Sequence, residues 1–121
     1  MGKLSTHVLD TAHGRPAAGV AIALYRIDGG QRTLLKHAAT NADGRCEAPL
    51  LEGDALQAGC YELVFAAGDY FSELERKAGV ALPEPRFIDL VTIAFGVADP
   101  AQNYHVPLVV TPWSYSTYRG S

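Results

Sequence analysis

Two histidines of this 121-residue chain stand inside mostly apolar segments, where their side chains could do chemistry. His7 lies between Thr6 and Val8, and His105 precedes the apolar stretch at 106–110. An imidazole in such a place loses hydration, so it needs a hydrogen-bonding partner or a chemical task. The task that fits is general acid or base catalysis, although a hydrogen-bonded structural role is the commoner explanation for any single histidine of this kind.

The remaining candidates are more ordinary. His13 and His37 lie in a loop and at the polar end of a segment, and we interpret both as solvated surface histidines. Arg45 directly follows the turn-forming residues 41–44. An arginine there is usually just exposed, but it could also serve as a fixed cation for a carbonyl oxygen or an organic anion. Spacing alone leaves both alternatives open.

Several function classes lack any signal. The formal net charge of −3, with no run of Lys and Arg, argues against nucleic acid or an anionic membrane as partner. The sequence contains no Gly-rich phosphate loop, serine-hydrolase elbow or paired acidic motif. Cys46 and Cys60 are not spaced as metal ligands, and buried thiols within strands fit them at least as well as a disulfide, so we assign them no function. Neither a membrane span nor a hydrophobic signal region is present, so we expect a cytoplasmic protein.

The elements that must position these residues are short strands. Alternating or β-branched apolar residues predict eight of them, at residues 4–10, 20–27, 32–40, 45–49, 60–66, 87–95, 103–111 and 114–119. One helix is predicted at 69–77, with Asp69 as its cap, a Glu73–Lys77 pair and Gly79 at its end. The length allows one domain over residues 1–121. This pattern indicates an antiparallel sandwich or barrel and does not choose between them.

Two motifs resemble those of the transthyretin-like family. The first consists of Val8-Leu9-Asp10 followed by Gly14-Arg15-Pro16-Ala17, and the second is Trp113-Ser114-Tyr115-Ser116-Thr117. The predicted strand order and the lone helix after the fifth strand agree, so the resemblance covers essentially the whole chain. It implies an all-β fold, the transthyretin-like (prealbumin-like) antiparallel β-sandwich of eight strands with one short helix.

The family contains hormone-carrying transthyretins and 5-hydroxyisourate hydrolases, and the sequence resembles the hydrolases. Its last residues, Tyr118-Arg119-Gly120-Ser121, look like the hydrolase ending. By the resemblance, His7 stands where the carriers have lysine, His105 where they have threonine, and Arg45 where they have an acid. A carrier of a hydrophobic small molecule is the alternative function, and a structural module acting through its surface is a third.

The resemblance also implies a site and a reaction. The expected catalytic residues are His7, Arg45, His105 and Ser121, and the expected substrate-binding residues are His7, Arg45, Tyr118, Arg119 and Gly120. The implied reaction is hydrolysis of a ring amide of 5-hydroxyisourate, in urate degradation, without a metal or other cofactor. Either histidine could be the base, and Ser121 could act through its hydroxyl or its terminal carboxylate. The implied assembly is a homotetramer in which the last strands pair between subunits.

Overall fold

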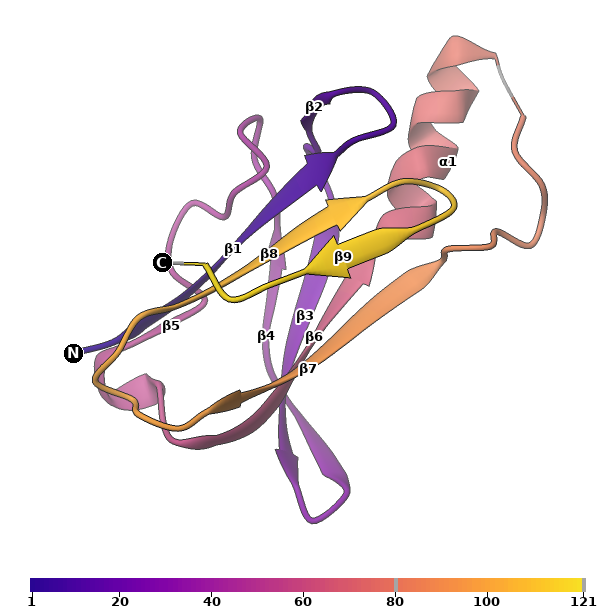
Figure 1. The fold of residues 1–121 in the computed structure, drawn as a ribbon. Coiled ribbons are helices and arrows are strands. Elements are labelled where there is room, and N and C mark those ends of the chain that lie inside the picture. Colours follow the sequence, from indigo (N-terminus) through magenta and orange to yellow (C-terminus); the bar gives the residue numbers. More distant parts are fainter. Residues whose placement is uncertain (80, 121) are drawn as a thin grey trace.

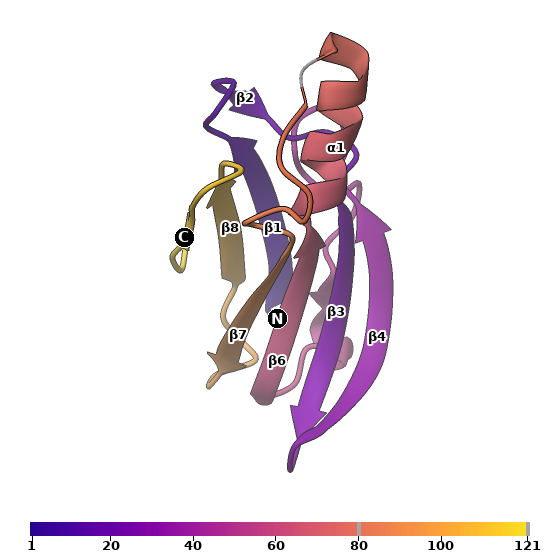
Figure 2. The same ribbon diagram turned by 90° about the vertical axis from the view of Figure 1, so that its right-hand side faces the viewer.

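The computed structural model describes residues 1–79 and 81–120, which form two facing sheets (Figures 1 and 2). One sheet has the order β2-β1-β8-β9, with β5 also paired to β1. Its strands are β1 (Lys3–Asp10), β2 (Arg15–Pro16), β5 (Leu51–Glu52), β8 (Tyr104–Val110) and β9 (Tyr115–Thr117). The other has the order β4-β3-β6-β7. Its strands are β3 (Ala21–Asp28), β4 (Gln31–Ala39), β6 (Gly59–Ala66) and β7 (Leu90–Val97).

The space between the sheets is filled by alternate residues of the strands. In β1, Leu4 and Val8 are 0 % exposed, and Ser5 and His7 on the opposite face are only half-buried. A slip of β1 by one residue would put Ser5 and His7 into the core and Leu4 and Val8 outside, so burial fixes the register firmly. The same force that builds the core therefore holds His7 on the outer face of the sheet.

The pairing of β1 with β8 is parallel, whereas all other strand pairs in the described residues are antiparallel. In this register Ser5 is the partner of His105, and His7 is the partner of Pro107. The predicted sandwich is confirmed, and the expectation that it is antiparallel holds except at this central pair. Parallel pairing joins segments about a hundred residues apart and places both candidate histidines in one sheet.

The prediction of a strand at residues 45–49 is wrong. Its pairing with β1 is limited to a single bridge between Arg45 and His7. On either side of the segment, the Val8 amide donates to the Gly44 carbonyl (2.8 Å) and the Leu50 amide donates to the Leu4 carbonyl (2.8 Å). Regular pairing resumes in β5, and β2 lies within the turn predicted before the second strand. Because of these two short strands, the described residues contain nine strands rather than eight. The segment crosses the edge of β1 without forming a ladder.

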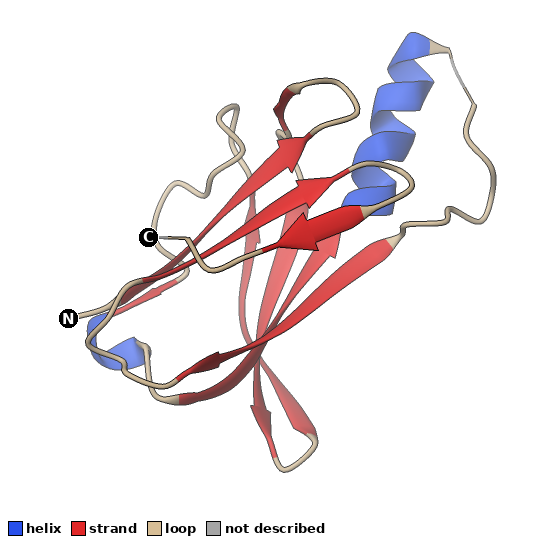
Figure 3. Ribbon diagram, in the orientation of Figure 1, coloured by secondary structure: helices blue, strands red, loops and turns tan. Residues whose placement is uncertain are grey.

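The helical segments α1 (Ala67–Ala78) and η1 (Gly53–Ala55) lie at opposite ends of the strands (Figure 3). Helix α1 begins before the predicted cap, so that Asp69 lies in its first turn, where a carboxylate still favours the helix dipole. Glu73 pairs with Arg76 instead of Lys77. Gly79 ends the helix in the left-handed conformation, φ 73°, as predicted. Neither described helix has the length and apolar character to cross a membrane.

The predictions for His13 and for the two cysteines need correction. His13 is exposed but not free, because its Nδ1 lies 2.7 Å from the Asp10 carboxylate, which is 0 % exposed and also accepts from the Tyr70 hydroxyl (2.8 Å). This network joins the end of β1 to α1, and the pKa of Tyr70 is raised to about 12 there, through burial and then through Asp10.

The cysteines are not both buried, since Cys60 is exposed and Cys46 is half-buried outside any strand.

Candidate active site

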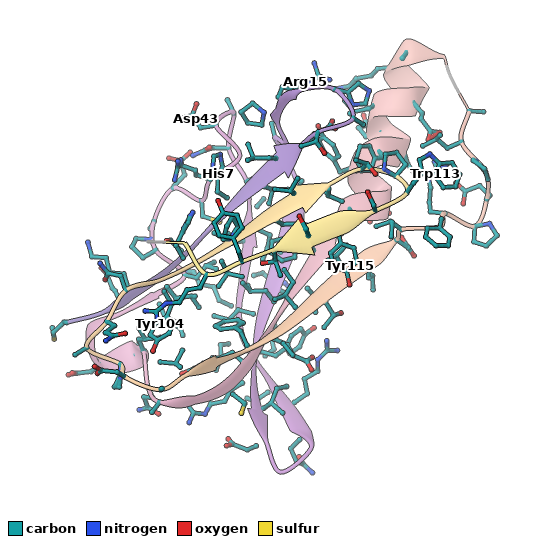
Figure 4. All side chains as sticks on the ribbon, viewed as in Figure 1. His7, Arg15, Asp43, Tyr104, Trp113 and Tyr115 are labelled. Carbon is teal, nitrogen blue, oxygen red and sulfur yellow. The ribbon has the colours of Figure 1, made fainter. Side chains whose placement is uncertain are left out.

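His7 and His105 lie on the same outward face of the β1–β8 pair. The register that joins Ser5 to His105 makes His7 a diagonal neighbour of His105, because side chains two residues apart in a strand share a face. Both rings are half-buried. Figure 4 shows His7 on β1, next to the turn that carries Asp43. The two predicted imidazoles are thus brought together by the central parallel pair of the sheet.

His7 is oriented by the main chain of that turn. Its Nε2 lies 2.9 Å from the Asp43 carbonyl oxygen. Because a carbonyl only accepts, Nε2 must carry the proton, and the neutral ring then has its lone pair at Nδ1. The turn needs glycine at Gly44, where φ is +76° and a Cβ would stand 2.4 Å from the Val8 carbonyl oxygen. The local sequence thus determines which nitrogen of His7 can take a proton.

Arg45 reaches the same face through an isolated antiparallel bridge with His7. The turn before it is closed by the Asn41 side chain, which accepts from the amides of Asp43 (2.9 Å) and Arg45 (3.2 Å). Arg45 is exposed, and no carboxylate of residues 1–79 and 81–120 forms an ion pair with its guanidinium. The backbone of Arg45 is thus fixed, and a guanidinium that it carries can bind a carbonyl oxygen or an anion.

His105 is held on two sides. Its Nδ1 lies 2.8 Å from the Ser5 hydroxyl, and its carbonyl accepts from the Gly120 amide at 2.7 Å. A Cβ on Gly120 would stand 2.6 Å from Cδ2 of the ring, so any side chain at 120 would displace the imidazole. Burial, then the positive charge of Arg45 and of His7, lowers the pKa of His105 below its ordinary value. At neutral pH His105 is therefore a neutral imidazole.

The C-terminal residues divide into two groups. Gly120 packs on His105, and Tyr118 is 61 % exposed. The Arg119 guanidinium instead donates to the Gln102 side chain (3.1 Å) and the Asn103 carbonyl (3.0 Å), and it lies over the Tyr104 ring. Ser121, a predicted catalytic residue, lies outside the described residues. The structure therefore joins Gly120, but not the guanidinium of Arg119, to the two histidines and Arg45.

One residue of the site was not predicted from the sequence. Ser5 lies two residues before His7 on the same outward face and contacts His105. The only available signal was that alternation with His7, which is too common in strands to indicate a function. In the described parts of the chain, no cluster of His, Cys, Asp or Glu could hold a metal ion. The chemistry on this face is that of two imidazoles, one hydroxyl and one guanidinium.

A two-sheet sandwich of this topology, with imidazoles and a cation on the outer face of one sheet, defines a transthyretin-fold protein with a polar site. A sea bream transthyretin in complex with thyroxine shares the fold, with a TM-score of 0.82 at 23 % identity over 98 % of this chain and 94 % of that chain. The model of the HIUase/Transthyretin family matches residues 4–120, and the chain belongs to that family.

Within the family, several curated relatives that match this chain over nearly its full length carry the name 5-hydroxyisourate hydrolase. The chain is 63 % identical to the 5-hydroxyisourate hydrolase of Ralstonia nicotianae, over 100 % of both chains. Among solved structures, the Klebsiella pneumoniae 5-hydroxyisourate hydrolase is 35 % identical over 100 % of both chains, with a TM-score of 0.78. Family membership and fold, both expected from the terminal motifs, are confirmed.

Proposed function

We propose that this chain is a 5-hydroxyisourate hydrolase, an enzyme of urate degradation. The observation that carries the proposal is the convergence of His7, Arg45 and His105 on one outward face. The proposal is also supported by full-length relatives, at up to 63 % identity, that are named 5-hydroxyisourate hydrolase. The reaction adds water to a ring amide carbonyl of 5-hydroxyisourate and gives 2-oxo-4-hydroxy-4-carboxy-5-ureidoimidazoline. All the groups that this hydrolysis needs are side chains, so we propose no cofactor.

The proposed mechanism distributes three tasks. A neutral imidazole of the His7/His105 pair takes a proton from water, and the resulting hydroxide oxygen bonds to the amide carbon. Arg45 binds the substrate and stabilises the developing oxyanion. The carbon–nitrogen bond then breaks, and the protonated imidazole returns its proton to the leaving nitrogen. Because its depressed pKa keeps His105 neutral, that residue suits the base, while His7 offers a lone pair at Nδ1 and remains an alternative.

The C-terminal residues complete the proposed site. We assign Tyr118, Arg119 and Gly120 to substrate binding and Ser121 to orienting a histidine, through its hydroxyl or its carboxylate. For Arg119 the contact with substrate would come from the main chain, because its guanidinium is engaged by Gln102 and Asn103. Tyr118 is exposed and large, so it would narrow the space available to a ligand.

The proposed enzyme is a single-domain homotetramer of the cytoplasm. The strand β9 forms an edge of its sheet, and unpaired edges are natural places for strands of two subunits to meet. Exposed aromatic side chains lie beside that edge, at Tyr115 and Tyr118. Such pairing would place the C-terminal residues of each subunit in an enclosed channel rather than on a free surface.

The decisive experiment follows freshly prepared 5-hydroxyisourate by its ultraviolet absorbance. We expect the purified protein to accelerate the decay in proportion to its concentration, and an equal concentration of a transthyretin carrier to leave the spontaneous rate unchanged. A spontaneous rate in the presence of this protein would contradict the enzyme and leave a binding protein as the explanation. The same traces give kcat and KM for the variants discussed below.

Activity should persist below the ordinary pKa of histidine. The pKa of His105 is lowered from 6.5, so the unprotonated base is retained to a lower pH than in a free imidazole. If His105 is the base, kcat/KM should fall to half its plateau only below pH 6.5, since kcat/KM reports groups of the free enzyme. Initial rates between about pH 5 and 8, corrected for spontaneous decay, measure this midpoint. A midpoint above 6.5 would exclude His105 as that base.

A further inference from the structure

Ser5 is joined to the site by the strand register and by a hydrogen bond. It is the register partner of His105 across the parallel β1–β8 pair, so the two side chains leave the sheet side by side on the same face. The Ser5 Oγ lies 2.8 Å from Nδ1 of His105, and both groups are half-buried. Register, face and distance thus point the Ser5 hydroxyl at one particular nitrogen of the candidate base.

The His105 ring has two nitrogens, and this contact decides which of them can meet the substrate. Nδ1 is engaged by Ser5 and the Cδ2 edge is packed against Gly120, so Nε2 is the ring nitrogen that the described residues leave for chemistry. A hydrogen bond at one ring nitrogen determines where the proton resides on a neutral imidazole. If the hydroxyl accepts from Nδ1–H, then Nε2 has the lone pair that a base requires. If the hydroxyl donates, then Nε2 carries a hydrogen.

The positive charge of the site favours the first arrangement. The Arg45 guanidinium, which is always charged, acts on His105 as a positive charge. A lone pair at Nε2 faces such a field more favourably than an N–H dipole does, because the N–H carries the positive end of the dipole. This charge favours the tautomer with its proton at Nδ1, donated to Ser5. His7 shows the reverse case, in which Nε2 donates to the Asp43 carbonyl and Nδ1 keeps the lone pair.

We propose that Ser5 is a positioning residue of the active site, whose hydroxyl accepts a hydrogen bond from Nδ1–H of His105 and thereby directs the Nε2 lone pair toward the water that attacks the substrate. This assignment rests on the proposed hydrolase function and extends it to a residue that does not itself touch the reacting atoms. The required group is a hydroxyl at position 5, so threonine should replace serine and alanine should not.

The kinetic test compares Ser5→Ala with Ser5→Thr. We expect Ser5→Ala to lower kcat about tenfold, the factor that corresponds to one hydrogen bond, with KM within about twofold of the wild type. Ser5→Thr should keep kcat within about threefold, because its hydroxyl can occupy the same position and threonine suits a strand. If Ser5→Ala keeps wild-type kcat, or if Ser5→Thr loses as much as Ser5→Ala, the positioning role is wrong.

A spectroscopic test is independent of turnover. Two-dimensional ¹H–¹⁵N spectra that correlate ring protons with ring nitrogens distinguish protonated from unprotonated imidazole nitrogens, and a His105→Gln variant assigns the signals. At neutral pH the wild type and Ser5→Thr should show a protonated Nδ1 and an unprotonated Nε2 on His105. A protonated Nε2 in the wild type would overturn the proposal, even if Ser5→Ala does not fold. A wild type inactive on 5-hydroxyisourate would instead refute the proposed function, and the tautomer would still be measured.

Discussion

Replacing His105 or His7 by alanine should lower the turnover of 5-hydroxyisourate at least about a hundredfold, the usual contribution of a positioned acid or base. Both imidazoles lie on the outward face of the sheet, so neither substitution removes a side chain from the core between the sheets. The fold should therefore survive each change. Steady-state rates, together with thermal unfolding followed by circular dichroism, separate a loss of chemistry from a loss of structure.

A matched control is available within the chain. His37 is an exposed histidine on β4 of the opposite sheet, and His37→Ala should retain wild-type kcat and KM. The double variant with alanine at both 7 and 105 should be no more active than the worse single variant, if the two imidazoles act on one substrate. Near-normal turnover by a folded double variant would contradict the site assignment.

The long strands could be predicted because burial leaves a regular mark on the sequence. In β1 the apolar Leu4 and Val8 lie on the core face, and in β6 every second residue from 61 to 65 is a buried aromatic or leucine side chain. Both strands were predicted within one residue of their ends. The segment at 45–49 shows the limit. Its residue types suit a strand, but it pairs with β1 only in the single bridge between Arg45 and His7, and no regular pairing follows before β5. Whether a segment forms a ladder depends on a partner strand, and the amino-acid composition of the segment does not specify that partner.

Part of the site could also be predicted, because a residue that departs from the pattern of a buried strand is visible in the sequence. His7 and His105 stood out because a histidine inside an apolar strand is unusual, and Arg45 was a possible fixed cation because it follows a turn. The family resemblance favoured that role for Arg45 and added the C-terminal residues. Ser5 gave no signal, since an outward serine in a strand is ordinary. Its role depends on a contact 100 residues away in sequence, created by parallel pairing of β1 with β8. The sequence also did not predict the contacts of the Arg119 guanidinium with residues 102–104.

Removal of residues 118–121 should abolish hydrolysis and preserve both fold and assembly. The strand β9 ends at Thr117, whose hydroxyl donates to the Pro107 carbonyl at 2.7 Å, so its pairing with β8 does not require the residues beyond it. The deletion removes the Gly120 amide that binds the His105 carbonyl, and it leaves the Cδ2 edge of that ring uncovered. A ring supported only by Ser5 is less firmly oriented, and much of catalysis depends on such orientation. Turnover and size-exclusion chromatography with light scattering measure the two outcomes.

A shorter deletion locates the effect within the C-terminal residues. Removing Ser121 alone keeps Gly120 against His105 and keeps Arg119 bound to Gln102 and Asn103. If Ser121 orients a histidine as proposed, this variant should lose activity while His105 keeps its place. If it is fully active and the longer deletion is not, Gly120 carries the effect through its contact with His105. Full activity of the longer deletion would refute a catalytic role for the C-terminus altogether.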